Sequence, residues 1–184
     1  MKGLLKTTCV YGERIVDEIK FVELVIEYSD MVYRLALHDC RNPQDAEDIM
    51  QTVFMKLYMK KPAFESQEHA RYWLLRVTVN ECRRLFASGW KKRTDYLETF
   101  QEQGKLLEDS TAGNCTREQQ ETVLEAVFQL PRKYRIPVYL YYYEEYSVAE
   151  ISDILGRNPS TVQTQLDRAR KKMKKQLEEA GYYE

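Results

Sequence analysis

The segment from Tyr146 to Lys175 constrains the fold most, because it contains two helical patterns joined by a short turn with a glycine. Four apolar residues of the first pattern share one face of a short helix: Val148, Ile151, Ile154 and Leu155. Ser147 and Glu150 form a capping-box pattern at its start. Gly156 suits the left-handed conformation that ends many helices, since it has no Cβ. The sequence therefore predicts a short helix that stops sharply at Gly156.

The second pattern predicts a helix that begins near Pro159, with Asn158 as its cap. Proline is tolerated in the first turn, because an N–H there would have no partner within the helix. Four residues are spaced as an inward face: Val162, Leu166, Ala169 and Met173. Two helices joined by a glycine turn are typical of a helix-turn-helix.

The outward face of the second helix has the chemistry that duplex DNA requires. Polar residues that can hydrogen-bond base edges lie toward its N-terminal end, namely Ser160, Thr161, Gln163, Thr164, Gln165 and Arg168. Basic residues that can hold phosphates follow, namely Arg170, Lys171, Lys172, Lys174 and Lys175. An amphipathic surface helix with a solvated basic face would have the same pattern, so the rest of the chain must decide.

Composition excludes several other classes of protein. At 184 residues the chain can form one ordinary domain or two small ones. No apolar run approaches the roughly 20 residues of a membrane span, and the first residues lack the pattern of a secretory signal. The four cysteines are scattered without CxxC spacing, which favours reduced thiols in the cytoplasm. His38 and Cys40 are the closest approach to a metal-ligand pair, but a tetrahedral site needs about four convergent ligands.

Charge is distributed unevenly although the formal net charge is only −1. One basic block comprises Arg76, Arg83, Arg84, Lys91, Lys92 and Arg93, and the end of the second helix forms another. The segment between them, from Asp95 to Glu125, is mainly acidic. This distribution indicates two DNA-facing modules on a flexible connection.

Helical periodicity organises the first module. Apolar stripes predict helices from about Lys20 to Cys40, from Asp45 to Lys60 and from about Ser66 to Ala87. The second helix can bury Ala46, Ile49, Met50, Val53, Phe54 and Leu57, and the third can bury Trp73, Leu74, Val77 and Phe86. We therefore predict an N-terminal extension at 1–19 with loose order, and an all-α bundle at 20–93.

The second module follows an acidic linker at 94–117 and occupies 118–184. A stripe of Val123, Leu124, Val127 and Leu130 ends at Pro131, and a tyrosine-rich helix is expected from Arg132 to Tyr143. Pro137 falls within that helix and should lie near its start or kink it. The predicted fold class is all-α, with two small helical domains.

Three segments in this order resemble the extracytoplasmic-function (ECF) group of bacterial RNA polymerase sigma factors, in the sigma-70 family. They are DAEDIMQTVF, WLLRVTVN and LPRKYRIPVYLYYYEEYSVAEISDILGRNPSTVQTQLDRARKKMKK. The resemblance covers most of residues 20–87 and 122–177. It implies two helical domains, called regions two and four, that bind core RNA polymerase and direct promoter-specific transcription initiation.

Family roles carry over position by position. Docking on the polymerase β′ clamp helices is implied for Glu47, Asp48, Gln51 and Met55, and contact with the β flap for Leu130 and Pro131. Binding and melting of the downstream (minus-ten) element is implied for Arg76, Asn80, Arg83 and Arg84. Reading of the upstream (minus-thirty-five) element is implied for Ser160, Thr161, Gln163, Thr164, Gln165, Arg168, Arg170, Lys171 and Lys172. The sequence departs from the family at Thr52, Arg84 and Ala87, where Glu, Asp and Arg are usual.

The implied partners are core RNA polymerase, promoter DNA and an anti-sigma factor, in the cytoplasm and with no membrane insertion of its own. No cofactor or metal is expected. The alternative is a stand-alone helix-turn-helix regulator, but that leaves DAEDIMQTVF and WLLRVTVN without a role. An enzyme is not expected, because no GxSxG, P-loop, HExxH or Rossmann glycine pattern is present.

Overall fold

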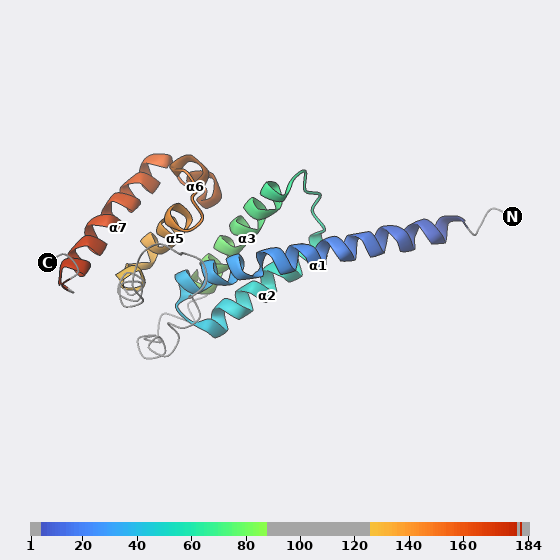
Figure 1. The fold of residues 1–184 in the computed structure, drawn as a ribbon, viewed down its shortest axis with the longest axis horizontal. Coiled ribbons are helices and arrows are strands. Elements are labelled where there is room, and N and C mark those ends of the chain that lie inside the picture. Colours follow the sequence, from blue (N-terminus) through green and yellow to red (C-terminus); the bar gives the residue numbers. More distant parts are fainter. Residues whose placement is uncertain (1–4, 88–125, 180, 182–184) are drawn as a thin grey trace.

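The computed structural model describes residues 5–87, 126–179 and 181, with side chains described from residue 20 onward. These residues form helices and turns without a strand, as the sequence predicted (Figure 1). The helices are α1 (Leu5–Cys40), α2 (Pro43–Lys60), α3 (Gln67–Ala87), α5 (Arg132–Tyr142), α6 (Val148–Leu155) and α7 (Pro159–Glu179). The predictions for Lys91–Arg93, the linker 94–117 and residues 118–125 lie outside this part of the chain. None of the helices described is long and apolar enough to cross a membrane.

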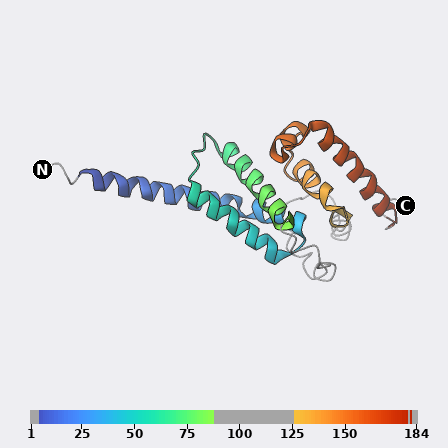
Figure 2. The same ribbon diagram turned by 180° about the vertical axis from the view of Figure 1, so that it is seen from behind.

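Helix α1 is longer than predicted. It begins at Leu5 instead of near Lys20, so the predicted start of this helix was wrong. Residues 5–19 contain no proline and a single glycine, Gly12, so nothing in them stops a helix from extending backward. Its N-terminal part projects beyond the other helices (Figure 2). At the other end, Arg41 takes a left-handed φ of 56° and terminates the helix.

Helix α2 has the ends that the sequence predicted. The Asn42 side chain accepts a hydrogen bond from the Asp45 backbone N–H at 3.0 Å, and Pro43 occupies the first turn. Lys61 closes the helix in a left-handed conformation and donates its N–H to the Leu57 carbonyl at 3.0 Å. Five of the six residues predicted for its inner face are buried, and Met50 is half-buried. These contacts hold α2 against α1 and α3.

Helix α3 completes the first domain. Leu74 and Cys82 are fully buried in a core that they share with residues of α1 and α2. Trp73 is half-buried and packs edge-on against Phe64, with ring centroids 5.9 Å apart. Trp73 therefore has a structural position at the margin of this core, as does Phe86.

The second domain contains the predicted helix-turn-helix. Both hydrogen bonds of the capping box are present at α6: Glu150 accepts from the Ser147 N–H at 2.8 Å, and Ser147 accepts from the Glu150 N–H at 3.3 Å. Gly156 ends α6 with a φ of 59°. Val162, Leu166 and Ala169 are fully buried, which confirms the inward face of α7.

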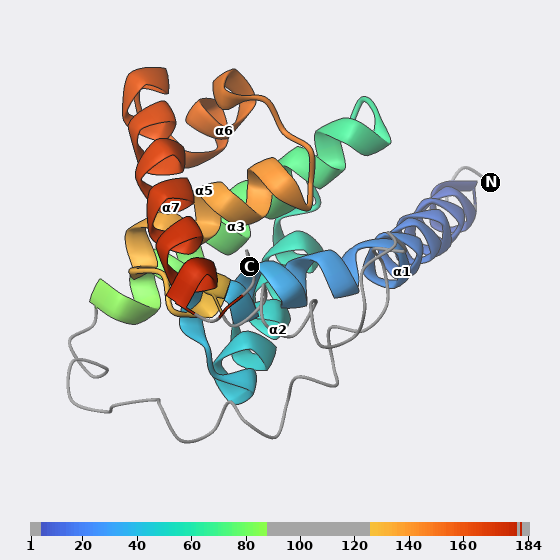
Figure 3. The same cartoon turned by 60° about the vertical axis from the view of Figure 1, so that its left-hand side comes forward.

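The two domains pack directly on each other. Figure 3 shows α5 and α6 beside α3, and contacts join α1 to α5 and α3 to α6. Leu35 of α1 and Leu75 and Val79 of α3 belong to the same apolar cluster as the core of the second domain. The structure is therefore a closed arrangement in which part of the apolar core crosses the domain boundary.

His38 lies at this boundary among aromatic rings. It is 1% exposed, and its ring centroid lies 4.7 Å from that of Tyr139 and 5.2 Å from that of Phe128. Burial, together with the nearby charges of Arg135 and Arg34, lowers the pKa of His38 from 6.5 to about 3. The folded protein therefore holds a neutral imidazole here.

We predict that His38 makes the protein sensitive to acid. Between pH 6.5 and 3 the unfolded chain binds a proton that the folded chain excludes, so stability falls as the pH falls through that window. The free energy of unfolding should drop by about 2 kcal/mol from this residue between about pH 7 and pH 5. Urea unfolding of the native protein and of His38→Phe at both pH values measures the effect. The variant should lose it, whereas His69→Phe, at an exposed position, should retain it; equal acid sensitivity in both variants would refute the assignment.

Candidate nucleic-acid and polymerase interface

The outward face of α7 presents hydrogen-bonding groups to solvent. Five of its predicted base-reading residues are exposed, and Gln165 is half-buried. Gln165 accepts from Arg157 at 3.1 Å, and Gln163 donates to Asp167 at 3.1 Å. A groove of about 330 Å³ runs along this face, lined by Lys133, Tyr134, Ser160, Thr161, Thr164, Gln165 and Arg168. The face combines amide, hydroxyl and guanidinium groups, which can read base edges in a major groove.

Lys133 belongs to this groove although the sequence did not predict it, because it lies in α5, well before the helix-turn-helix. The fold places it beside Arg168. Its ammonium lies 5.0 Å from the ring centroid of Tyr134. The available signal was a basic residue in the first turn of α5. Sequence periodicity alone does not show that α5 and α7 lie together.

The basic residues toward the end of α7 differ in whether they have a partner within the chain. Lys171 and Lys172 are exposed. Arg170 donates from Nε to the Tyr142 hydroxyl at 2.9 Å and lies 3.6 Å from Asp167. Lys174 and Lys175 form exposed ion pairs with Glu178 and Glu179. Lys171 and Lys172 are thus the more readily available phosphate contacts in this segment.

Helix α3 presents the predicted basic face in part. Arg76, Asn80 and Arg84 are exposed, with Arg84 3.2 Å from Glu81. Arg83 is half-buried instead, and its Nη2 donates to the Leu155 carbonyl at the end of α6 at 2.7 Å. Burial and the nearby Arg157 charge lower the pKa of Arg83. Three of the four residues predicted for the downstream element therefore face solvent, and Arg83 contacts the second domain.

The outer face of α2 carries the residues predicted to dock on polymerase. Glu47, Asp48, Gln51 and Met55 are all exposed, and Met55 is 63% exposed despite its apolar side chain. A shallow hollow of about 560 Å³ joins this face to the end of α3, lined by Asp48, Ile49, Thr52, Glu81, Arg84, Leu85 and Ala87. The three positions that depart from the family pattern, Thr52, Arg84 and Ala87, all line this one hollow.

The two residues predicted to contact the polymerase β flap, Leu130 and Pro131, differ in burial. Leu130 is 0% exposed and belongs to the second domain's core, whereas Pro131 is exposed. The Leu130 carbonyl accepts from Arg135 at 2.9 Å and from Arg41 of the first domain at 3.5 Å. In this closed arrangement the Leu130 side chain is covered and only Pro131 of the pair is accessible.

An ion pair that the sequence did not reveal joins the domains. Asp39, at the end of α1, is 1% exposed and accepts from Arg132 of α5 through both carboxylate oxygens, at 2.6–3.1 Å. Arg132 also donates to the Cys82 carbonyl at 3.0 Å, and its guanidinium lies 3.5 Å from the Phe86 ring centroid. Burial raises the pKa of Asp39, and the Arg132 charge opposes that rise.

A second ion pair also spans the domain boundary. Arg71 of α3 lies 2.6 Å from Glu144, which follows α5. The Arg71 guanidinium also lies 5.2 Å from the ring centroid of Tyr146, just before α6. The two pairs therefore tie α1 and α3 of the first domain to both ends of α5.

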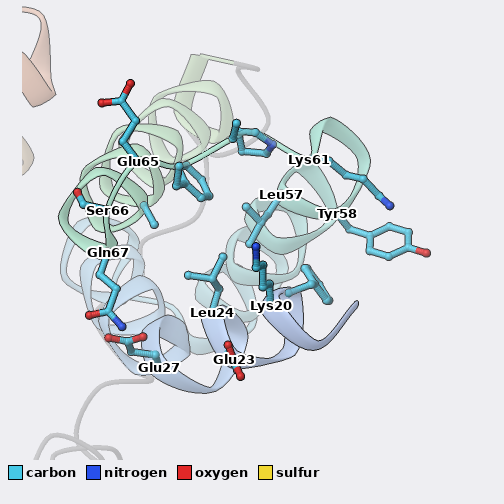
Figure 4. Close-up of a pocket in the computed structure, with 15 residues that line it drawn as sticks. Lys20, Glu23, Leu24, Glu27, Leu57, Tyr58, Lys61, Glu65, Ser66 and Gln67 are labelled. Carbon is cyan, nitrogen blue, oxygen red and sulfur yellow. The ribbon is translucent and has the colours of Figure 1, made fainter. Parts of the chain in front are cut away.

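A separate pocket of about 520 Å³ lies between α1, the end of α2 and the loop before α3 (Figure 4). Leu24 and Leu57 point into it, and Tyr58 and Lys61 lie at its rim. Gln67 lines it at the start of α3, and Asn80 follows about 20 Å further along that helix at the usual rise per residue. The pocket is therefore remote from the exposed basic face around Asn80.

The described residues contain no group of three or more His, Cys, Asp or Glu side chains that converge as metal ligands. His38 is enclosed by aromatic rings, and the Cys40 thiol donates to the Asn42 carbonyl at 3.3 Å. The faces described above offer exposed charges and hydrogen-bonding groups.

Comparison with known proteins covers both domains. Residues 24–92 match the family described as Sigma-70 region 2, and residues 120–173 match Sigma-70, region 4. The chain is 30% identical to the ECF RNA polymerase sigma factor SigW of Bacillus subtilis over 173 residues, which span 88% of this chain and 90% of that protein. It is 27% identical to the ECF RNA polymerase sigma-E factor of Escherichia coli over 162 residues, 84% of each chain.

A solved structure has a similar fold. The sigma factor RpoE of Bartonella quintana, solved in complex with the anti-sigma factor NepR, superposes with a TM-score of 0.64 at 18% identity, over 86% of this chain and 97% of that one. The two helical domains and their order define the class as the sigma-70 family. The chain belongs to the ECF group of RNA polymerase sigma factors. It acts with core RNA polymerase in promoter-specific transcription initiation, and the alternative of a stand-alone regulator is not favoured.

We predict that the Asp39–Arg132 pair holds the domains together. Asp39→Asn removes one charge and leaves the partly exposed Arg132 without its counter-ion, so the closed arrangement should be destabilised by about 2–3 kcal/mol. Small-angle X-ray scattering should then give a larger radius of gyration than for the native chain. Asp30→Asn is the matched control, because the exposed Asp30 carboxylate pairs with Arg34 within α1. No expansion of Asp39→Asn relative to this control would contradict the prediction.

Proposed function

We propose that the outward face of α7 reads the upstream promoter element. The observation that carries this proposal is a row of Ser, Thr, Gln and Arg side chains exposed on the second helix of a helix-turn-helix whose first helix is capped at both ends. Ser160, Thr161 and Gln163 lie at its N-terminal end, which enters the major groove in proteins of this motif. Arg168 adds a guanidinium that can bind guanine, while Lys171 and Lys172 hold phosphates.

We propose that Arg76, Asn80 and Arg84 bind the downstream element, joined by Arg83 once it is released from Leu155. Capturing an extruded base requires hydrogen-bonding groups beside positive charge that holds the backbone. The exposed α3 face supports this role, because one amide and two guanidinium groups lie on it. Polymerase docking is assigned to Glu47, Asp48, Gln51 and Met55 of α2 and to the Leu130–Pro131 segment.

Binding both elements requires the domains to separate. Elements centred about 25 base pairs apart are roughly 85 Å apart along B-form DNA. Helix α6 contacts α3 in the closed arrangement, and the 21 residues of α7 extend only about 31 Å. The closed chain cannot reach both elements, so we propose that it opens on polymerase and DNA.

Regulation by a protein partner is part of the proposal. The Bartonella sigma factor of similar fold was solved with an anti-sigma factor, and by analogy we assign this chain an anti-sigma partner. We place its action in the cytoplasm, where core polymerase and promoters are found. Sigma factors are not in general enzymes, and we assign no catalytic role to any residue here.

The docking assignment predicts the outcome of run-off transcription. Core polymerase with the native chain and a pool of promoter fragments should give discrete start sites. Asp48→Ala combined with Gln51→Ala should remove at least about 90% of this product, since truncating a side chain at the centre of an interface costs about 1–2 kcal/mol. The control is Glu23→Ala with Lys20→Ala, which changes two exposed residues of α1 away from the docking face of α2. Undiminished start sites with the α2 variant would refute docking through this face.

If α7 reads the upstream element, a substitution on its outward face should weaken initiation without weakening binding to core polymerase. Arg168→Ala should weaken promoter-specific initiation about tenfold, because a guanidinium bound to a base contributes about 1–3 kcal/mol. Binding to core polymerase should be unchanged, as measured by co-purification. Lys175→Ala, near the end of α7 and paired with Glu179, should have a much smaller effect on initiation. Equal reduction of promoter-specific initiation and core binding in Arg168→Ala would count against the assignment.

A further inference from the structure

A cavity of about 300 Å³ lies where the two domains meet. Its walls come from the ends of α1 and α6, from α3, from the first turns of α5 and from the turn before α7. The lining residues are Asp39, Arg83, Arg132, Lys133, Ile136, Pro137, Leu155 and Arg157. The cavity therefore exists only while the domains are closed, because each domain supplies part of its wall.

Positive charge is in excess around this cavity. Four of the lining side chains are cationic and one is a carboxylate, Asp39. Both oxygens of Asp39 already accept hydrogen bonds from Arg132. This leaves Arg83, Lys133 and Arg157 without a carboxylate from the cavity wall.

The remaining cations have neutral partners among the described residues. Arg83 donates to the Leu155 carbonyl at 2.7 Å, and Arg157 donates to the Gln165 amide oxygen at 3.1 Å. The Lys133 ammonium lies over the Tyr134 ring. Each of these contacts uses only part of the donor capacity of a guanidinium or an ammonium, which have about five and three N–H groups. Donors therefore remain for a ligand.

Cations gathered around a partly enclosed space repel one another, and burial strengthens that repulsion. Burial and the nearby charge of Arg157 both lower the pKa of Arg83, as such crowding requires. An anion relieves the repulsion, and the planar fork of arginine matches phosphate oxygens in pairs. A volume of about 300 Å³ is at the lower end for small-molecule sites, and a duplex is too wide to enter a space of this size between two domains.

We propose that this cavity binds a small diphosphate-bearing anion, held by Arg83 from the first domain and by Arg157 and Lys133 from the second. Because the ligand contacts both domains, it stabilises the closed arrangement and opposes the opening that initiation requires. Binding itself is independent of the proposed function; only this consequence for initiation rests on it.

Thermal unfolding of the full chain with and without pyrophosphate tests the proposal, with sodium chloride added to match ionic strength. Pyrophosphate should raise the melting temperature by about 3 °C or more above the chloride reference. Arg83→Gln combined with Arg157→Gln should abolish the rise. Lys60→Gln combined with Lys175→Gln should keep it, because these residues are exposed, one in each domain, and their replacement removes the same charge.

The single variant Arg157→Gln controls for a folding defect in the double variant, because Arg157 is exposed on a turn and its replacement should not disturb folding. It should reduce the rise by at least half. No rise above chloride, or an equal rise in the Arg157→Gln variant and the Lys60/Lys175 control, would overturn the proposal.

A short DNA duplex and run-off transcription complete the test. Stabilisation by the duplex that depends on Arg83 and Arg157, without any effect of pyrophosphate, would also overturn the proposal, because the cations would then serve the DNA backbone. If pyrophosphate stabilises the chain as expected but run-off transcription fails, the diphosphate site stands and the proposed function falls.

Discussion

The closed arrangement of the two domains depends on a buried carboxylate. Removing Asp39 from water costs several kcal/mol, and this cost is offset only by close, well-oriented charges and hydrogen bonds. Arg132 supplies a bidentate guanidinium, and Arg135 donates to the Asp39 backbone carbonyl at 2.8 Å. Because such a pair tolerates little displacement, it fixes how α5 sits on α1, and removal of either partner leaves the other charge uncompensated.

Apolar packing supplies the attraction between the two domains, and the ion pair sets their relative orientation. Leu35, Leu75 and Val79 bury their side chains against the second domain, and each fully buried aliphatic side chain contributes about 1.5–3 kcal/mol. At the same junction the Leu130 carbonyl accepts from Arg41 of the first domain, and Arg83 donates to the end of α6. Residues proposed for polymerase and DNA contact are thus used within the closed chain, so closure and initiation compete for the same residues.

Local signals in the sequence predicted the helices and their ends well. Asn42, Ser147 and Gly156 act within a few residues of where they stand, and the structure confirms all three. The exposed faces of α2 and α7 also followed from periodicity. The closed junction did not, because Asp39 and Arg132 are distant in the sequence and no periodic pattern pairs them. The length of α1 was not predicted for a different reason: the absence of a helix-breaking residue is a weaker signal than the apolar stripe that begins near Lys20.

A sign of the junction is nevertheless present in the sequence. Asp39 follows Leu35 by four residues, which places a carboxylate on the face of α1 that is otherwise apolar and buried. A charge on such a face requires a partner of opposite charge, since burial alone would be prohibitive. Once the structure shows that this face is buried, the position of Asp39 requires a cation at the end of α1, but the choice among the many arginines of this chain depends on tertiary structure. Arg132 is the partner because the start of α5 lies beside the end of α1 in space. The same placement brings Lys133 to the groove on the outward face of α7. One helix start thus connects the junction between the domains with the DNA-facing groove.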